Sequence, residues 1–239
     1  MVIALVTGAN SGIGEAVARQ LARQPDHHVI LTARNLEAGE KVAAAIVEEG
    51  YSASAVHLDL SSDVSISAVT KHIQEVYGKL DILVNNAGTA IDHRTDLSVR
   101  ENLSMTFDTN VFGTAVLTDA LLGLLRQSTA PRVVFVSSSL GSLALSKDEN
   151  WRHNHITWKS YKSSKAAVNM LVLHYSSALR DANGLVNSVC PGLVKTKLNG
   201  YADDGVTPEI GAQRIVELAL VGADGPAATF SDRDGSIPW

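Results

Sequence analysis

Short apolar runs alternate with longer stretches of helical periodicity along nearly the whole chain, and this alternation restricts the fold more than any other feature. The runs contain many β-branched residues and few charges, which is typical of parallel strands covered on both faces. They lie at 2–6, 28–33, 53–60, 80–86, 132–138, 185–191 and 227–230. Helices are expected between them, at 15–24, 35–50, 62–77, 97–127, 160–182 and 208–220. The alternation predicts an α/β fold, with a doubly wound parallel sheet of about seven strands and helices on both faces.

No repeat, low-complexity run or flexible linker divides the 239 residues, so one domain is expected over 1–239. Two segments, 139–159 and 195–207, are too long and too polar to be simple connections. Loops of this length inside a compact domain are more often functional than not. We therefore expect both segments to border a substrate pocket.

Composition excludes several classes of protein. A net charge of -5 gives no electrostatic reason to expect nucleic acid or an anionic membrane as a partner. The single cysteine, Cys190, excludes an internal disulfide framework and fits a reducing compartment. The start "MVIALVTG" has no basic region, and its apolar run ends at Thr7, too early for a signal peptide or a membrane span. We expect a soluble, cytoplasmic protein.

A glycine-rich turn, "TGANSGIG" at 7–14, joins the first strand to the first helix. Gly8 allows a tight turn, Gly12 lets the backbone approach a pyrophosphate, and Gly14 lets the helix pack close to the strand. The amides at the helix N-terminus then face the phosphates. A purely structural turn is the alternative, but the strand before it and the helix after it favour a dinucleotide site. The residues of the turn expected in that site are Gly8, Asn10, Ser11, Gly12, Ile13 and Gly14.

The end of the second strand indicates which dinucleotide is bound. An acidic residue there would hydrogen-bond the ribose 2′-hydroxyl of NAD, but "LTARN" has Ala33 at that position and Arg34 after it. With no carboxylate to repel it, a 2′-phosphate can accept charge-assisted bonds from Arg34, and Ser11 can add a neutral one. NADP is therefore favoured over NAD, with a merely solvated arginine as the alternative. Asp59 is expected to accept from the adenine amino group or, alternatively, to N-cap the helix that starts near Ser62.

Six motifs, in order, resemble those of the short-chain dehydrogenase/reductase family. They are "TGANSGIG" (7–14), "NNAG" (85–88), "TNVFGT" (109–114), "VSSSLG" (136–141), "YKSSK" (161–165) and "PGLVKT" (191–196). Within the family, "LTARN", "VVFVSSSLGSLAL" and the closing "DGPAATFSDRDGSIPW" look most like the NADPH-dependent carbonyl reductases. The resemblance implies a single NADP-binding Rossmann domain and an oxidoreductase that acts on CH–OH groups with NADPH/NADP⁺ as its cofactor.

The resemblance also implies four catalytic residues. Tyr161 would be the general acid–base, and Lys165, one helical turn later, would lower the pKa of the phenol from its ordinary value of about 10. Lys165 would also hydrogen-bond the nicotinamide ribose. Ser138 would orient the substrate carbonyl and stabilise charge on its oxygen. Asn110, a mediocre helix former inside a predicted helix, would hold a water that links the lysine to solvent, with a purely structural asparagine as the alternative.

Further cofactor contacts are implied at the ends of other strands. The small residues of "NNAG" let the backbone approach the cofactor closely. The backbone that follows "PG" at 191–192 would meet the nicotinamide carboxamide. With Asp59, the implied contacts are Leu60, Asn86, Ala87, Gly88, Tyr161, Lys165, Pro191, Gly192, Val194 and Thr196.

The chain departs from the simplest family members by an extra segment, 145–160, before the catalytic helix. In carbonyl reductases an enlarged segment here covers the helices through which tetrameric relatives associate, so a monomer is expected. His153 and His155 in this segment lack a third ligand, so no metal site is expected. Phe135, where many relatives carry Asn, is expected to alter packing only. The candidate pocket-lining residues are Leu140, Trp158, Leu198 and Tyr201.

These observations predict an NADPH-dependent reductase that converts a small ketone or aldehyde to an alcohol. Reduction of an imine, action on a secondary-metabolite intermediate, or a non-redox step at the same site are alternatives within the fold. A non-catalytic NADP-binding sensor is a further alternative, but a sensor has no need of Asn110, Ser138, Tyr161 and Lys165 together. A methyltransferase would need an acidic end to the second strand, which Ala33 and Arg34 do not provide.

Overall fold

Eight strands form one sheet in the computed structural model, which describes residues 1–239. Their order is β3-β2-β1-β4-β5-β6-β7-β8, and the neighbours from β3 to β7 run parallel while β8 pairs antiparallel with β7. The strands are β1 Val2–Thr7, β2 His27–Ala33, β3 Ala53–His57, β4 Ile82–Asn85, β5 Arg132–Val136, β6 Leu185–Val189, β7 Phe230–Asp232 and β8 Gly235–Ser236. The doubly wound α/β fold is confirmed, with one short strand beyond the seven expected.

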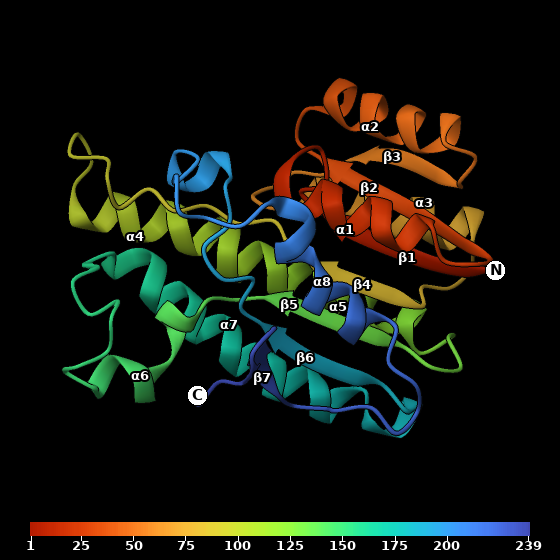
Figure 1. The fold of residues 1–239 in the computed structure, drawn as a ribbon. Helices are drawn as coiled ribbons and strands as arrows, with labels where there is room; N and C mark the ends of the chain where they lie inside the picture. The colour runs from red at the N-terminus through yellow and green to blue at the C-terminus, as the bar shows by residue number, and fades with distance from the viewer.

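Three helices cover each face of the sheet (Figure 1). On one face lie α1 Gly12–Ala22, α2 Leu36–Glu48 and α8 Pro208–Ala219. On the other lie α3 Asp63–Val76, α5 Thr114–Leu125 and α7 Lys159–Ala178. The remaining helical segments are α4 Val99–Phe107, the π-helical η1 Asp108–Gly113, the short α6 Leu143–Lys147, and the single turns η2 Ser139–Gly141, η3 Arg180–Ala182 and η4 Lys197–Asn199.

The two layers of core follow from the alternation of side chains along each strand. In β1, Ala4 and Val6 point into the layer beneath α1, α2 and α8, whereas Ile3 and Leu5 point into the layer beneath α3, α5 and α7. Phe135 on β5 is fully buried in the second layer and stacks on Tyr175, with ring centroids 5.8 Å apart. The expectation that Phe135 serves packing is confirmed.

The structure differs from the predicted elements where backbone geometry changes without a change in composition. The predicted helix 97–127 is α4, η1 and α5 in succession, because six residues at its centre adopt the wider π-helical turn. The last strand begins at Phe230 rather than near 227, and Gly235–Ser236 folds back on it as β8. Because β8 consists of two exposed residues, it has no apolar run from which the sequence could predict a strand.

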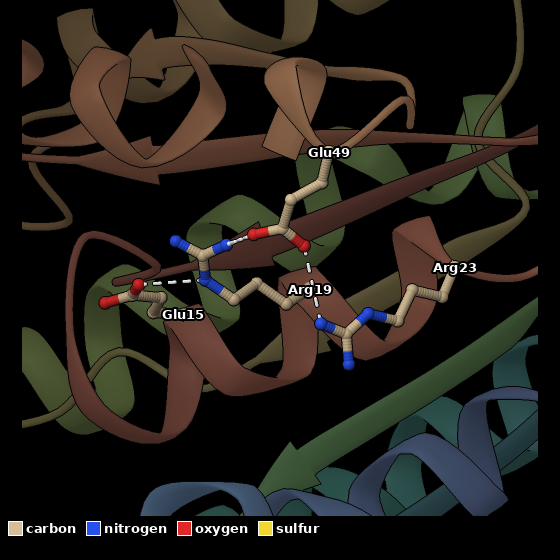
Figure 2. Close-up of polar contacts among 4 residues, drawn as sticks. All are labelled: Glu15, Arg19, Arg23 and Glu49. Atoms are coloured by element: carbon tan, nitrogen blue, oxygen red, sulfur yellow. Dashed lines mark hydrogen bonds and ion pairs between the residues drawn. The ribbon is translucent and has the colours of Figure 1, made fainter. Parts of the chain in front are cut away.

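An ion-pair group joins α1, which carries the glycine turn, to the end of α2. Figure 2 shows Arg19 between Glu15 and Glu49, with its Nε 3.0 Å from a Glu15 oxygen and an Nη on Glu49. Arg23, the C-cap residue just after α1, reaches the other oxygen of Glu49 at 3.4 Å. Each of these partly exposed pairs contributes little stability alone, but together they limit how α1 can move relative to α2.

The two long loops lie beyond the carboxyl ends of the strands, where Figure 1 shows α6 and the blue loop after β6 at the end of the molecule away from the N-terminus. The first loop contains α6 and is hydrogen-bonded to the last residues of the chain. Ser142 Oγ donates to the Pro238 carbonyl at 2.6 Å, and the Ala144 amide donates to the Trp239 carbonyl at 2.9 Å. The second contains η4 and is tied back by a backbone bridge between Val194 and Val206. Whether the first loop keeps the chain monomeric stays a prediction.

Candidate active site

The candidate site begins at the carboxyl ends of β1 and β4, the point where the strand order reverses direction. In doubly wound sheets such a switch point opens a crevice in which ligands bind. Here the two strand ends are joined by hydrogen bonds. The Thr7 hydroxyl accepts from the backbone amides of Asn86 at 3.0 Å and Ala87 at 2.9 Å, and the Asn86 side chain donates to the Thr7 carbonyl at 2.8 Å. Asn86, predicted as a cofactor contact, thus also holds the glycine turn in place.

The glycine turn has a conformation that other residues would not fit. Gly8 and Gly12 have positive φ angles of 64° and 57°. A Cβ at Gly14 would lie 2.4 Å from the Gly8 carbonyl oxygen and 2.5 Å from the Asn86 amide nitrogen. A Cβ at Gly12 would meet the Thr196 side chain at 3.3 Å, so the segment after β6 lies over the turn. The turn therefore leaves a bare backbone cradle at the N-terminus of α1, which fits a pyrophosphate. Asn10 and Ile13, the other predicted contacts of the turn, are partly exposed beside these glycines.

The residues expected around the adenosine half are present at neighbouring strand ends. Arg34 follows β2, is exposed and makes no ion pair within the protein, while Ala33 before it is buried. Ser11 occupies the N-cap position of α1 without using its hydroxyl to cap the helix. The positive charge of Arg34 also contributes to a lowered pKa of Asp59, although hydrogen bonds from Ser61 are the larger cause.

Asp59 does not cap α3, so that alternative is wrong. Its carboxylate accepts from the amide and hydroxyl of Ser61, at 3.0 and 2.8 Å, which forms a local turn. The N-cap of α3 is Ser62, whose hydroxyl accepts from the Ser65 amide at 3.3 Å. Leu60, which follows Asp59, is buried against η1, where its carbonyl oxygen lies directly over Gly113.

Three of the predicted catalytic side chains converge above β5 and β6. The hydroxyl of Ser138, which stands in extended conformation just after β5, lies near enough to the phenol of Tyr161 to lower its pKa slightly, and it accepts from the Leu140 amide at 3.2 Å. Lys165 lies one turn further along α7, with its Nζ 5.6 Å from the centroid of the Tyr161 ring. Lys165 is only 5% exposed, and its ammonium donates to the Val136 carbonyl at 2.7 Å. A phenol, a hydroxyl and an ammonium are thus held together at the end of the sheet.

Asn110 lies in η1 and faces the same place. Its side chain accepts from the Thr89 amide at 2.8 Å and donates to the Thr89 carbonyl at 2.9 Å and to Ser164 Oγ at 3.0 Å. A Cβ on Gly88 would lie 3.3 Å from Asn110 Oδ1 and 3.5 Å from Lys165 Nζ, so these two side chains meet over the "NNAG" backbone. A π-helical turn at this point is typical of functional sites.

In the protein without cofactor, burial has the largest effect on the pKa values of Tyr161 and Lys165, whereas the expectation was that Lys165 lowers the pKa of Tyr161. Burial raises the pKa of Tyr161 above its ordinary value of 10.0, with a smaller opposite effect of the nearby Ser138 hydroxyl. Burial also lowers the pKa of Lys165 to about 8. In the protein alone, loss of hydration is the largest cause of the shift for both groups. Near neutral pH the phenol keeps its proton.

The sequence did not indicate what fixes the start of α7. Its N-cap residue, Trp158, makes no side-chain capping bond. Asp92, from the loop after β4, accepts instead from the amides of Ser160 at 2.8 Å and Tyr161 at 3.1 Å. A carboxylate at this end also complements the helix dipole. Asp92 therefore anchors the backbone of Tyr161, and only a contact across 68 residues of sequence reveals it.

The residues expected to meet the nicotinamide follow β6, where Pro191 and Gly192 turn the chain with φ of 77° at the glycine. Val194 is buried, and Thr196 lies over Gly12. The four predicted pocket residues do not line the cavity that lies between the two long loops. That cavity, of about 430 Å³, is lined by Arg152, His153, His155, Ile156, Leu193 and Asp204.

Two other features bear on the kind of protein. Nowhere in the structure do three or more His, Cys, Asp or Glu side chains gather in a way that could hold a metal ion. The structure contains no helix whose length and apolar character would let it cross a membrane.

The switch-point crevice, the glycine cradle and the strand order define a Rossmann-type α/β protein. The sequence model of the family described as short chain dehydrogenase matches residues 2–206. The chain therefore belongs to the short-chain dehydrogenase/reductase family, whose members are oxidoreductases with a nicotinamide cofactor.

Curated relatives include fungal and mammalian enzymes. A short-chain dehydrogenase of Penicillium roqueforti is 36% identical over 227 residues, which span 92% of this chain and 89% of the relative. The carbonyl reductase [NADPH] 1 of Sus scrofa is 33% identical over 276 aligned positions, covering 99% of this chain and 94% of that enzyme. The resemblance to carbonyl reductases is thereby confirmed.

Solved structures agree with this placement. Salutaridine reductase from Papaver somniferum superimposes with a TM-score of 0.83 at 27% identity, covering 98% of this chain and 100% of that one. The NADPH-bound carbonyl reductase from chicken fatty liver has a TM-score of 0.85 at 24% identity over 100% of this chain and 98% of that one, which shows the shared fold.

Proposed function

We propose that the protein reduces a ketone or aldehyde by the reaction R₂C=O + NADPH + H⁺ → R₂CHOH + NADP⁺. The observation that carries this proposal is the convergence of the Tyr161 phenol, the Ser138 hydroxyl and the buried Lys165 ammonium at the end of the sheet. The cofactor, when bound, supplies the hydride that the carbonyl carbon accepts. The carbonyl oxygen then needs a proton and a donor to hold it, and this arrangement can supply both.

Each residue has one task in this proposal. Ser138 donates a hydrogen bond to the carbonyl oxygen and so stabilises the charge that develops there. Tyr161 donates the proton, and its raised pKa suits this direction because the phenol is protonated at neutral pH. Lys165 stabilises the phenolate that remains, by its charge. Asn110 hydrogen-bonds Thr89 and Ser164 beside this site. In the proposal, the proton that Tyr161 has donated is replaced from solvent at this position.

The residues at the strand ends support NADPH as the cofactor. Gly8, Gly12 and Gly14 place no side chains of their own between the backbone amides of the turn and a pyrophosphate. The exposed Arg34 has no competing partner, and Ala33 offers no carboxylate to accept from a ribose 2′-hydroxyl. A 2′-phosphate would therefore gain a charge-assisted bond here that NADH cannot make.

Replacing Arg34 by glutamine is expected to raise the KM for NADPH by about 10-fold or more and to leave the KM for NADH nearly unchanged, since hydrogen bonds to charged groups are worth about 1.5–3 kcal/mol. Steady-state rates with both cofactors measure the change. Arg180→Gln is the matched control, because Arg180 is exposed on η3 at the opposite end of the strands. If the KM of Arg34→Gln rose equally for NADH and NADPH, the arginine would not bind the 2′-phosphate.

The pKa of Lys165 predicts how activity depends on pH. With a pKa of about 8 in the free protein, the ammonium is present below that pH and lost as the pH rises through it. We expect kcat/KM for NADPH, which reports groups of the free enzyme, to fall above about pH 8. In Lys165→Arg the side chain stays charged, so whatever activity is left should lose this decline. A decline near pH 8 that persists in Lys165→Arg would assign it to another group.

A panel of ketones, aldehydes and imines with NADPH and NADH side by side tests the function as a whole. The proposal expects NADPH oxidation with at least one carbonyl class and a clear preference over NADH. Turnover of imines but not of carbonyls would replace the proposed reaction. Tight NADPH binding with no turnover of any acceptor would favour a sensor and overturn the proposal.

A further inference from the structure

The cavity between the two long loops has a composition that the hydride-transfer chemistry does not require. Of its six lining residues three are basic or imidazole side chains, Arg152, His153 and His155, and all three come from the segment that precedes α7. Ile156 and Leu193 supply apolar surface, and Asp204 is the one acidic group. Its volume of about 430 Å³ is that of a small-molecule site.

The segment that supplies most of this lining leads directly into the catalytic helix α7. The segment that carries the basic residues is held against α7 at both of its ends. At one end Trp151 lies beneath the Lys162 ammonium, 6.0 Å from the ring centroid. At the other end Trp158 packs edge-on against Tyr161, with centroids 6.0 Å apart and planes at 85°. Leu193, on the opposite wall, directly follows the Gly192 turn at the end of β6.

The guanidinium of Arg152 is oriented by its neighbour and is otherwise free. Its Nε donates to His153 Nε2 at 2.9 Å, so this imidazole nitrogen acts as the acceptor and the ring is neutral. Burial, with the positive charge of Arg152 as a smaller cause, lowers the pKa of His153 and favours that neutral form. The terminal nitrogens of Arg152 have no partner in the protein. A planar fork with free donors matches a carboxylate, which it can bind with two parallel hydrogen bonds.

Asp204 does not cancel this cation. It is exposed and forms no ion pair with Arg152 or with any other basic residue. The two full charges in the lining, Arg152 and Asp204, are opposite in sign, so the free donors of Arg152, and not a net charge, bear on the choice of ligand. A cation left unpaired beside a catalytic helix favours an anionic group on the ligand.

We infer that this cavity binds the carboxylate of the carbonyl substrate, that Arg152 is its specificity-determining residue, and that the preferred substrates are keto or aldehyde acids. The inference rests on the proposed function and adds a substrate class to it. Ile156 and Leu193 would contact the carbon skeleton between the two polar ends of such a substrate.

Matched pairs of substrates test this inference. Keto acids with increasing distance between the carbonyl and the carboxylate are compared with their methyl esters. An amino ketone is compared with its N-acetyl derivative to test for a preference for cations. NADPH oxidation is measured with the wild type, Arg152→Gln and the control Arg180→Gln. For the best pair, we expect kcat/KM for the acid to exceed that for the ester by about 10-fold or more, since hydrogen bonds to charged groups are strong.

In Arg152→Gln the acid should lose this advantage through a higher KM, while the ester is reduced as in the wild type. Arg180→Gln should leave both substrates unchanged. The inference would be overturned if the preference for the acid survived in Arg152→Gln, or if the ester were preferred in every pair. It would also be overturned by a preference for the amino ketone, because the cavity would then bind a cation through Asp204. Reduction of esters without any role for Arg152 would leave the proposed function standing. If no acid or ester is reduced while another ketone or aldehyde is, only the inference is overturned; if no carbonyl compound of either panel is reduced, the proposed function is overturned as well.

Discussion

Replacing Tyr161 by phenylalanine is expected to lower kcat for carbonyl reduction by roughly 100- to 10,000-fold, the range that a positioned acid–base group contributes. The change removes one hydroxyl and retains the ring that packs against Trp158. In the proposed reaction the lost hydroxyl is the proton donor, so the carbonyl oxygen would keep only the hydrogen bond from Ser138. Affinity for NADPH should barely change, because the cradle and Arg34 are untouched. Single-turnover kinetics with a fluorescence titration of NADPH separate the two effects.

Tyr175→Phe is the control for that experiment, because it removes a tyrosine hydroxyl from the same helix. The Tyr175 hydroxyl donates to the Ala115 carbonyl and to Asp119, each at 3.0 Å, and lies in the interface of α5 with α7. Its loss should cost about 1 kcal/mol of stability and leave kcat within about two-fold. A Tyr161→Phe enzyme with near-normal turnover would refute the assignment, as would an equal loss of turnover in Tyr175→Phe.

The sheet and the glycine cradle could be predicted because their causes are local in sequence. A strand buried on both faces must be a continuous apolar run, and "VIALV" followed by "TGANSGIG" contains the strand, the turn and the helix start within 14 residues. The spacing of Tyr161 and Lys165 is local in the same way, since residues four apart share one helix face. Parallel strands then bring Ser138 and the start of α7 to one edge of the sheet.

The parts that sequence did not predict depend on contacts between distant segments. Asp92 anchors α7 across 68 residues, and nothing in the composition of its loop marks it as a cap. The lining of the loop cavity depends on where Trp151 and Trp158 are held, so Arg152 could not be chosen before the fold was known. The raised pKa of Tyr161 in the protein alone could not be expected from the sequence, because charge pairing is visible in a spacing of four residues, but burial is not.

The second large effect is expected for Gly113→Ala, which should lower the stability of the fold because η1 closely contacts the loop after β3. A Cβ at Gly113 would lie 2.0 Å from the Leu60 carbonyl oxygen and 2.7 Å from its carbon, and backbone atoms cannot turn aside as a side chain can. The φ and ψ of Gly113, −62° and −37°, would suit alanine, so the cost is steric alone. We expect Gly113→Ala to destabilise the fold by about 3 kcal/mol, the upper end of overpacking effects. That corresponds to a Tm lower by roughly 6–12 °C for a domain of this size.

Gly123→Ala is the matched control, since Gly123 lies in α5, the helix that continues from Gly113, and a Cβ there would meet nothing within 4 Å. It should stabilise the protein by about 0.5–1 kcal/mol, because alanine favours the helix more than glycine does. Denaturant titration of both variants measures the difference. Equal stability of the two would mean that η1 does not pack on Leu60 as the structure has it. Because Asn110 stands one turn before Gly113, the expected displacement of η1 should also move Asn110 away from Thr89 and Ser164. A folded Gly113→Ala enzyme should therefore lose turnover as well as stability, whereas Gly123→Ala keeps both.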